Sequence, residues 1–282
     1  MFKIGVSTPC PIDEEMFKKY KEAGIFLMEV SVDKWQCEKL DFALLKEWSE
    51  KYGVELYSFH LPLWPFDEID ISSPTIAQPS IDCLSKYIVQ GSKIGINKFI
   101  IHPSGEPIEE KDRAQRLEIA KKSLYTLAEL AKKYGSVICV ENLPRTCLGR
   151  DSDDILKLLS AHKDLTVCFD TNHLLSEDPL EFIKKVGKNI ATLHISDYDF
   201  KNERHWLPGE GDLDWQSIIK ALKDIGYSNA WLYEIDLTTP NTIIRPRDLT
   251  YEDFSRNAKE LFEGKELTNI STRKNDLKYW NE

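Results

Sequence analysis

The chain has 282 residues, of which 41% are hydrophobic, and it carries a formal net charge of −10. This length allows a large core in one or two domains, and the acidic balance argues against a general attraction to phosphate backbones. No apolar run approaches the roughly 20 residues that cross a bilayer, and the first residues do not resemble a secretory signal.

Eight short apolar runs predict strands, and most are continuous rather than alternating, as is typical of parallel strands buried on both faces. In chain order they are FKIGVST (2–8), IFLMEVSV (25–32), VELYSFHL (54–61), KFIIHPS (98–104), SVICVEN (136–142), LTVCFDT (165–171), IATLHIS (190–196) and AWLYEID (230–236). Amphipathic stretches such as EEMFKKYKEAG and DWQSIIKALKDIG lie between them, and several end in glycine, the usual residue after a helix. Ser152 with Asp153, and Asp214, are predicted to cap helices.

Eight strands that alternate with helices predict a single-domain α/β fold, the (β/α)₈ TIM barrel, over residues 1–263. A doubly wound open sheet is the alternative, but no G-x-G-x-x-G motif follows the first strand. We expect residues 264–282 to form a polar C-terminal tail. The six cysteines are scattered without a C-x-x-C pair, which predicts reduced thiols and a cytoplasmic location.

Polar side chains stand at the carboxyl ends of these strands, where a (β/α)₈ barrel gathers its active site. They are His60, His102, Glu141, Asp170, His173, His194, Asp197 and Glu234. A single histidine at such a position is more often structural, but carboxylates inside apolar strands are costly to bury without a cation. The convergence of Glu141, Asp170 and Glu234 with a histidine therefore predicts a divalent metal site for Mn²⁺, Mg²⁺, Co²⁺ or Zn²⁺.

The motifs CVENLPR, CFDTNH, LHISDYD and LYEID resemble the strand ends of the xylose isomerase-like barrels, and this resemblance covers about residues 2 to 263. That superfamily holds sugar and sugar-phosphate isomerases and epimerases, inosose dehydratases and endonuclease IV. By resemblance to the ketose epimerases, the implied ligands of one divalent metal are Glu141, Asp170, His194 and Glu234. The resemblance also implies that Glu141 and Glu234 are the catalytic acid and base, and that His173 contacts a substrate oxygen.

Endonuclease IV, with three zinc ions, is the main alternative that the resemblance leaves open. The matching ligands would be His60, His102 and Glu141 for one ion, the four residues above for the second, and His173, Glu203 and His205 for the third. Only Glu203 departs from that pattern, because it replaces an aspartate, and the longer side chain argues against the third ion. If His60, His102, His173, Glu203 and His205 bind no further metal, we expect them to contact substrate.

The loops at the predicted barrel mouth argue against nucleic acid. TPCPIDEEM, LPLWPFDEIDISSP and HPSGEPIEEKDR are acidic, whereas a nuclease needs Arg or Lys to bind phosphates. Trp64 is expected to wall a sugar pocket. Arg145 and Arg204 are the candidate contacts to an anionic substrate group, and for Arg145 a structural ion pair is an equal alternative. Asp197 is predicted to accept a hydrogen bond from His194.

The sequence thus predicts a metal-dependent sugar or sugar-phosphate isomerase or epimerase that acts on a small carbohydrate. Such a reaction removes a proton next to a carbonyl through an enediolate, which two carboxylates and a metal can support. A sugar lyase or dehydratase would begin with the same step and remains a second alternative. A metal-binding barrel without activity would be expected to lack one of the two glutamates, and both are present. The sequence leaves open the sugar, the number of ions and assembly into a homo-oligomer.

Overall fold

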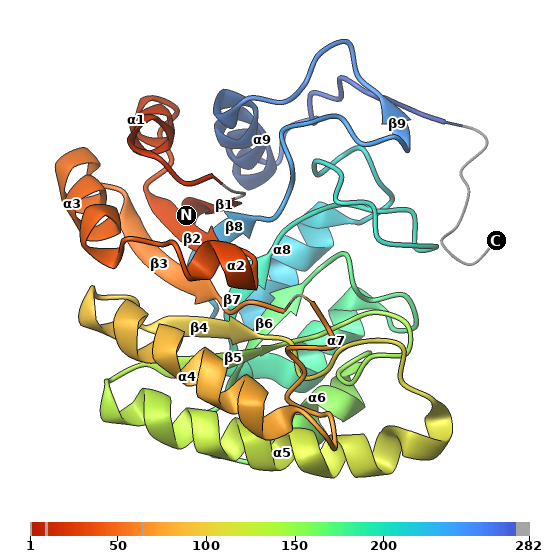
Figure 1. The fold of residues 1–282 in the computed structure, drawn as a ribbon. Coiled ribbons are helices and arrows are strands. Elements are labelled where there is room, and N and C mark those ends of the chain that lie inside the picture. The colour runs from red at the N-terminus through yellow and green to blue at the C-terminus, as the bar shows by residue number, and fades with distance from the viewer. Residues whose placement is uncertain (1, 9–10, 64, 275–282) are drawn as a thin grey trace.

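The computed structural model describes residues 2–8, 11–63 and 65–274, and its centre is one sheet of eight parallel strands (Figure 1). The strands are β1 (Lys3–Thr8), β2 (Leu27–Ser31), β3 (Glu55–His60), β4 (Lys98–Ile101), β5 (Val137–Glu141), β6 (Thr166–Asp170), β7 (Ile190–His194) and β8 (Ala230–Tyr233). Their order is β7-β6-β5-β4-β3-β2-β1-β8. The ring closes just beyond β7, where the Ile195 amide donates to the Leu232 carbonyl at 2.8 Å. The predicted (β/α)₈ barrel is therefore confirmed.

Helices surround the sheet and follow the strands along the chain (Figure 1). They are α1 (Glu14–Glu22), α2 (Lys34–Cys37), α3 (Phe42–Tyr52), α4 (Ala77–Lys93), α5 (Glu110–Lys133), α6 (Ser152–Leu159), α7 (Pro179–Val186), the 3₁₀ turn η1 (Gly187–Asn189), α8 (Trp215–Asp224) and α9 (Tyr251–Glu263). The first and last helices meet, because the rings of Tyr20 and Tyr251 lie 4.6 Å apart. Among the described residues, no helix is both long and apolar enough to cross a membrane.

Aspartates begin several of these helices by accepting hydrogen bonds from backbone amides of the first turn. The capping residues are Asp13, Asp41, Asp151, Asp178 and Asp214. The predicted cap at Asp214 is confirmed, whereas the predicted cap of α6 at Ser152 and Asp153 is wrong by one residue. Asp151 takes that role, since its side chain accepts from the Asp154 amide at 2.8 Å.

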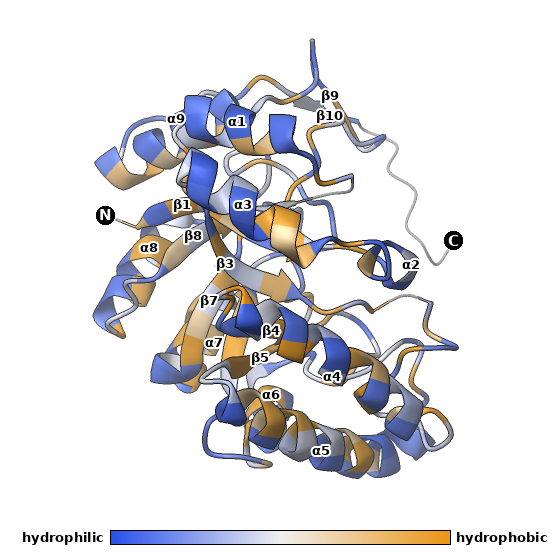
Figure 2. Cartoon of the chain, turned by 60° about the vertical axis from the view of Figure 1, so that its left-hand side comes forward, coloured by the Kyte–Doolittle hydropathy of each residue, from blue (hydrophilic) through white to orange (hydrophobic). Residues whose placement is uncertain are grey.

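The strands are buried on both faces, as their apolar sequences predicted. One face packs against the helices, for example where Phe59 of β3 stacks on Phe42 of α3. Two smaller clusters consist of strand residues separate from that main core, and they fill the inside of the barrel: Leu27, Tyr57, Ala230 and Leu232, and Ile100, Cys139 and Cys168. In Figure 2 the strands β4, β5 and β7 are mainly hydrophobic, whereas the helices carry both kinds of residue.

The segment after α9 returns toward the barrel mouth. A small antiparallel pair joins β9 (Ile243–Ile244) to β10 (Thr272–Arg273), so residues of the predicted tail pair with the loop that follows β8. Arg273 also forms an ion pair with Asp212 at 2.8 Å. Through these contacts, residues up to Lys274 lie against the loops that follow β7 and β8.

Candidate active site

The carboxyl ends of the strands bring the predicted polar side chains together at one mouth of the barrel. Two β-bulges set their direction. Tyr57 is the extra residue where β3 pairs with β2, and Ala191 is the extra residue where β7 pairs with β6. Beyond these bulges, Ser31 pairs with His60, and Asp170 pairs with His194. Because a bulge shifts which side chains face inward, both irregularities aim polar groups at the interior.

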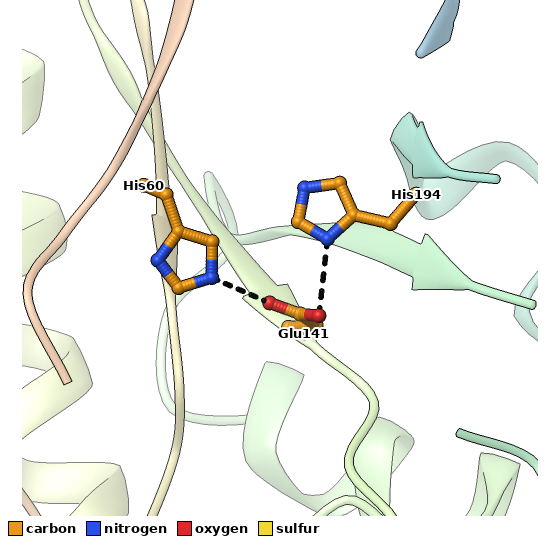
Figure 3. Close-up of side chains that lie close together, drawn as sticks. All are labelled: His60, Glu141 and His194. Atoms are coloured by element: carbon orange, nitrogen blue, oxygen red, sulfur yellow. Dashed lines mark hydrogen bonds and ion pairs between the residues drawn. The ribbon is translucent and has the colours of Figure 1, made fainter. Parts of the chain in front are cut away.

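Glu141 lies at the centre of the site, between imidazole rings (Figure 3). Its Oε2 lies 3.1 Å from His60 Nε2 and 3.3 Å from His102 Nε2, and its Oε1 lies 3.1 Å from His194 Nδ1. Burial alone would raise the pKa of the Glu141 carboxyl, but His194 and His102 outweigh it and hold that pKa well below its usual range. Glu141 is therefore an ionised carboxylate in a buried site.

Asp170 has an oxygen without a hydrogen bond in the same place. Its Oδ1 accepts from the Asn172 amide at 2.6 Å, but its fully buried Oδ2 has no hydrogen-bond partner among the described residues. Burial raises the pKa of the Asp170 carboxyl well above its ordinary value. A buried oxygen of this kind normally has a partner, and a cation beside it would supply one.

Four of these side chains satisfy the geometry of a metal site. Glu141, Asp170, His194 and Glu234 each offer one ligand atom, and these atoms all lie within 4.8 Å of one another. The donors are three carboxylates and one imidazole, a set that suits Mg²⁺, Mn²⁺, Co²⁺ or Zn²⁺. The orphaned Asp170 Oδ2 lies on the same cluster. The residues present therefore fit a divalent cation.

Sequence reasoning missed Glu29, a carboxylate of β2 that completes the surroundings of His194. Its Oε1 lies 2.9 Å from His194 Nε2, and its Oε2 accepts a hydrogen bond from Ser58 Oγ at 2.7 Å. The Glu29 side chain is fully buried. His194 thus presents Nδ1 to Glu141 and Glu234 and donates Nε2–H to Glu29, the usual arrangement behind a metal-binding histidine.

The comparisons with known proteins agree with this architecture. The family model described as a xylose isomerase-like TIM barrel matches residues 17–254. The chain belongs to this family. The predicted resemblance is confirmed.

Relatives of this xylose isomerase-like barrel include archaeal and bacterial proteins. An uncharacterized protein of Methanocaldococcus jannaschii is 25% identical over 244 residues, which cover 80% of this chain and 80% of the relative. The inosose isomerase of Bacillus licheniformis is 28% identical over 164 residues, which cover 54% of this chain and 55% of the relative. Among solved structures, a D-tagatose 3-epimerase-like protein matches with a TM-score of 0.80 at 22% identity, covering 93% of this chain and 97% of that one.

A second polar cluster lies beside the first in this xylose isomerase-like barrel. His173, Glu203 and His205 each offer a ligand atom within 4.8 Å of the others, so the structure brings together all three predicted residues. His173 Nε2 lies 3.0 Å from Glu203 Oε1, and His173 Nδ1 donates to the Asn142 carbonyl at 2.9 Å. Burial would raise the pKa of Glu203, but His173 and Arg145 lower it to about 2.

The two predicted arginines are both engaged in ion pairs. Arg145 lies between Glu106 and Glu203 and forms an ion pair with each. The structure therefore shows the ion pair that was the alternative to a substrate contact for this residue. Arg204 is nearly buried, and its Nε donates to Asp199 Oδ2 at 3.0 Å. Arg204 still lines the cavity at the mouth, so its contact with substrate stays a prediction. Trp64 lies outside the described residues.

The prediction that Asp197 supports His194 is wrong. The Asp197 carboxylate instead accepts from the backbone amides of Tyr198, Gly209 and Leu213 and from the indole of Trp215. It therefore organises the loop after β7, while Glu29 takes the place beside His194. Burial raises the pKa of Asp197 despite these donors.

A cavity of about 470 Å³ opens over Glu234, large enough for a small ligand. Its lining includes hydroxyl, carboxylate and imidazole groups from the carboxyl-terminal ends of β1 and β2 and from the loops that follow β7 and β8. The lining residues are Ser7, Ser31, Arg204, His205, Glu234, Ile235, Asp236, Thr238, Thr239 and Pro240. Eight of these ten side chains carry a hydrogen-bonding group, which suits a polyhydroxylated ligand.

Proposed function

We propose that this protein is a divalent-metal-dependent sugar isomerase or epimerase, and that Glu141, Asp170, His194 and Glu234 hold the metal. The carrying observation is the cluster of three carboxylates and one imidazole, buried except at Glu234, in which Asp170 Oδ2 lacks a hydrogen bond. The adjoining polar cavity and the names of the relatives, an inosose isomerase and an epimerase-like protein, support the same class of activity.

Glu141 and Glu234 are the proposed acid and base. The nearby His194 imidazole lowers the pKa of both carboxyls against the effect of burial, which favours the carboxylate form that a base needs. One glutamate takes a carbon-bound proton next to the sugar carbonyl and becomes a carboxylic acid. In an isomerisation it returns that proton to the neighbouring atom, whereas in an epimerisation the other glutamate, protonated beforehand, gives its proton to the opposite face. A divalent cation at the cluster would supply Lewis-acid stabilisation of the negative charge that develops on the substrate oxygens.

The proposal includes a small carbohydrate as substrate, bound in the cavity over Glu234. His60, His102, His173 and His205 surround the two glutamates and would donate or accept hydrogen bonds at sugar hydroxyls. We also propose a cytoplasmic location, for which the free thiols of Cys37, Cys83, Cys139, Cys147 and Cys168 argue.

An endonuclease IV-like activity is the second candidate, and the His173–Glu203–His205 cluster is the observation that favours it. A DNA nuclease, however, needs cations free to contact phosphates. Arg145 and Arg204 at this mouth are instead paired with carboxylates. These pairs favour the sugar enzyme.

Proton exchange in D₂O tests the proposed function. The chelator-stripped protein, reloaded with Mn²⁺, Mg²⁺, Co²⁺ or Zn²⁺, is incubated with ketoses and 3-keto sugars, and loss of the proton signal next to the carbonyl is followed by NMR. We expect Glu234→Gln to slow exchange by about 10²–10⁴-fold and the exposed Glu50→Gln to leave it unchanged.

The same experiment separates the alternatives. Exchange with elimination of water would identify a dehydratase, because the first step is shared. If the native protein exchanges the proton of no substrate on the panel faster than the Glu234→Gln variant does, the isomerase proposal fails for that panel. If the protein instead cleaves abasic-site DNA and this cleavage requires Glu141, the nuclease function replaces the isomerase proposal.

A further inference from the structure

Arg145 joins three of the loops at the barrel mouth. Its Nε donates to Glu106 Oε2 at 3.1 Å, and Nη2 contacts the other oxygen of the same carboxylate. On its opposite side, Nη1 contacts Glu203 Oε2 and donates to Asn202 Oδ1 at 3.2 Å. The guanidinium therefore lies between two carboxylates, one from the loop after β4 and one from the loop after β7.

The backbone holds this arginine in an unfavourable conformation. Arg145 has a φ of 51°, in the left-handed region that residues other than glycine rarely adopt. The turn around it is fixed by hydrogen bonds from the Leu143 amide to the Gly149 carbonyl and from the Cys147 amide to the Pro144 carbonyl, both 3.2 Å. A strained residue that is held in this way often serves the site beside it.

Glu203 is the shared member of two arrangements. One of its oxygens faces His173 Nε2 at 3.0 Å, toward the candidate cluster with His205, and the other is held by Arg145. Arg145 and Glu203 are only 25% and 21% exposed, so water screens their charges weakly. A divalent cation bound between His173, Glu203 and His205 would share the Glu203 carboxylate with the positively charged guanidinium of Arg145.

We propose that Arg145 takes the place of a cation at the His173–Glu203–His205 cluster and thereby keeps a divalent metal out of it. The guanidinium already contacts Glu203 Oε2, on the only carboxylate of that cluster, and its charge would repel a second cation. In the cluster of Glu141, Asp170, His194 and Glu234, the three carboxylates all face Nδ1 of His194, a nitrogen that can itself bind a metal, and this cluster remains the metal site. Arg145 thus determines how many ions the barrel holds.

The two histidines of the second cluster are held by contacts that do not involve Arg145. His173 is held by the Asn142 carbonyl, and the His205 amide donates to Asn172 Oδ1 at 3.3 Å. Neither contact involves Arg145. Replacing the guanidinium with an uncharged side chain of similar length should therefore open a site with two imidazoles and one carboxylate, a donor set suited to Zn²⁺ or Co²⁺.

The test is a count of bound ions in the full-length chain. Native protein and Arg145→Met are stripped with chelator, equilibrated with Zn²⁺ and analysed by mass spectrometry, and Co²⁺ absorption spectra report the ligands. We expect Arg145→Met to bind about one ion more than the native chain. The further substitution His205→Ala should remove that ion, and Arg150→Met, at an exposed ion pair, should leave the native count unchanged.

An equal count in native and folded Arg145→Met protein would overturn the inference. His205→Ala in the native background gives an answer that does not depend on whether Arg145→Met folds. There we expect no change in the ion count, and a loss of about one ion would show that the native cluster already binds metal. Because these are differences in ion number, they can be measured even if no sugar reacts, so failure of the proposed function is a separate outcome.

Discussion

Glu29 orients His194 from inside the barrel. Its two oxygens contact different partners, Ser58 Oγ and His194 Nε2, so the carboxylate cannot turn without losing one of them. Fixing the Nε2–H of His194 leaves Nδ1 as the nitrogen that faces Glu141 and Glu234. A histidine with its proton held in this way is a better metal ligand than a freely rotating one.

We therefore predict that Glu29→Gln lowers the affinity for the divalent metal by about 10–100-fold, because the amide is a weaker acceptor for His194. Titration calorimetry on chelator-stripped protein measures this affinity directly. Glu55 is exposed at the start of β3, at the end of the strand away from the site. Glu55→Gln is therefore the matched control and should bind metal like the native chain. Native affinity in Glu29→Gln would show that Glu29 is only a packing residue.

Glu29 also shows what limits prediction at single residues. Glu29 is a carboxylate inside the apolar strand IFLMEVSV, just as Glu141, Asp170 and Glu234 lie in apolar strands. Its position does not mark it as a site residue, because it precedes the end of its strand by two residues, whereas the active site of such a barrel is expected at strand ends. The opposite error arose at Asp197, because sequence spacing cannot show that a loop folds its own amides around a carboxylate.

The loop between β7 and α8 packs closely around the carboxylate of Asp197. Asp197 binds three of its backbone amides, and Gly211 passes so close that a Cβ there would lie 2.0 Å from Asp197 Oδ1 and 2.5 Å from the Tyr198 amide. Only glycine allows this approach. The same loop carries Glu203 and His205, so its packing positions residues of the second cluster.

Gly211→Ala is expected to lower the free energy of unfolding by about 3 kcal/mol, because the methyl group must displace the Asp197 carboxylate or the backbone. Urea denaturation measures this change, and proton exchange with a sugar substrate should fall as well. At Gly135 φ is +71°, but an added Cβ would meet none of the described residues within 4 Å apart from its chain neighbours. Gly135→Ala therefore introduces backbone strain far from the loop and should spare the exchange. Equal effects of the two substitutions would contradict the close-approach argument.

Helix α9 begins with a network around Asp253 that links stability to pH. Thr250 donates its amide to Asp253 at 2.8 Å, and Arg247 donates from both terminal nitrogens at 2.6 and 2.9 Å. Burial would raise the pKa of Asp253, but Arg247 and the Thr250 amide hold it below the ordinary value of 3.8. A lowered pKa means that the folded state releases this proton more readily than the unfolded state.

The contribution of Asp253 is therefore complete above its ordinary pKa and is lost as the pH falls toward the lower folded value. We predict that Asp253→Asn lowers the free energy of unfolding by about 2 kcal/mol near neutral pH, and that the difference from the native chain shrinks below about pH 4. Denaturant unfolding across this range measures it. Asp67→Asn, on an exposed turn, is the control. A difference that stays constant with pH would exclude this linkage.

At the level of elements, the eight strands and the helices between them followed from the sequence because burial on both faces leaves continuous apolar runs. The irregular features could not be predicted in this way. The bulges at Tyr57 and Ala191 add one residue without altering the apolar pattern. The β9–β10 pair has only two residues in each strand, and its partners are far apart in the sequence, so no local periodicity marks it.

The barrel as a whole makes the site a meeting point of distant chain segments. The four proposed metal ligands come from the ends of β5, β6 and β7 and from the residue after β8, while Glu29 supports them from β2. The ring is completed between β7 and β8 by the backbone contacts of Ile195, next to His194. A cation held by these residues would therefore join the last strands across the point where the barrel closes.

Metal removal should consequently destabilise the whole chain rather than one loop. Binding at about 100 times the dissociation constant adds about 2.7 kcal/mol to the free energy of unfolding, and 1 kcal/mol shifts the Tm of a domain near this size by about 2–4 °C. We predict that excess divalent metal raises the Tm of chelator-stripped protein by about 5–10 °C, measured by scanning calorimetry. The double variant Asp170→Asn, Glu234→Gln should lose this shift, whereas Glu50→Gln should keep it. An equal shift in the double variant would place the stabilising ion outside the Glu141 cluster, because two of its proposed ligands would then be dispensable.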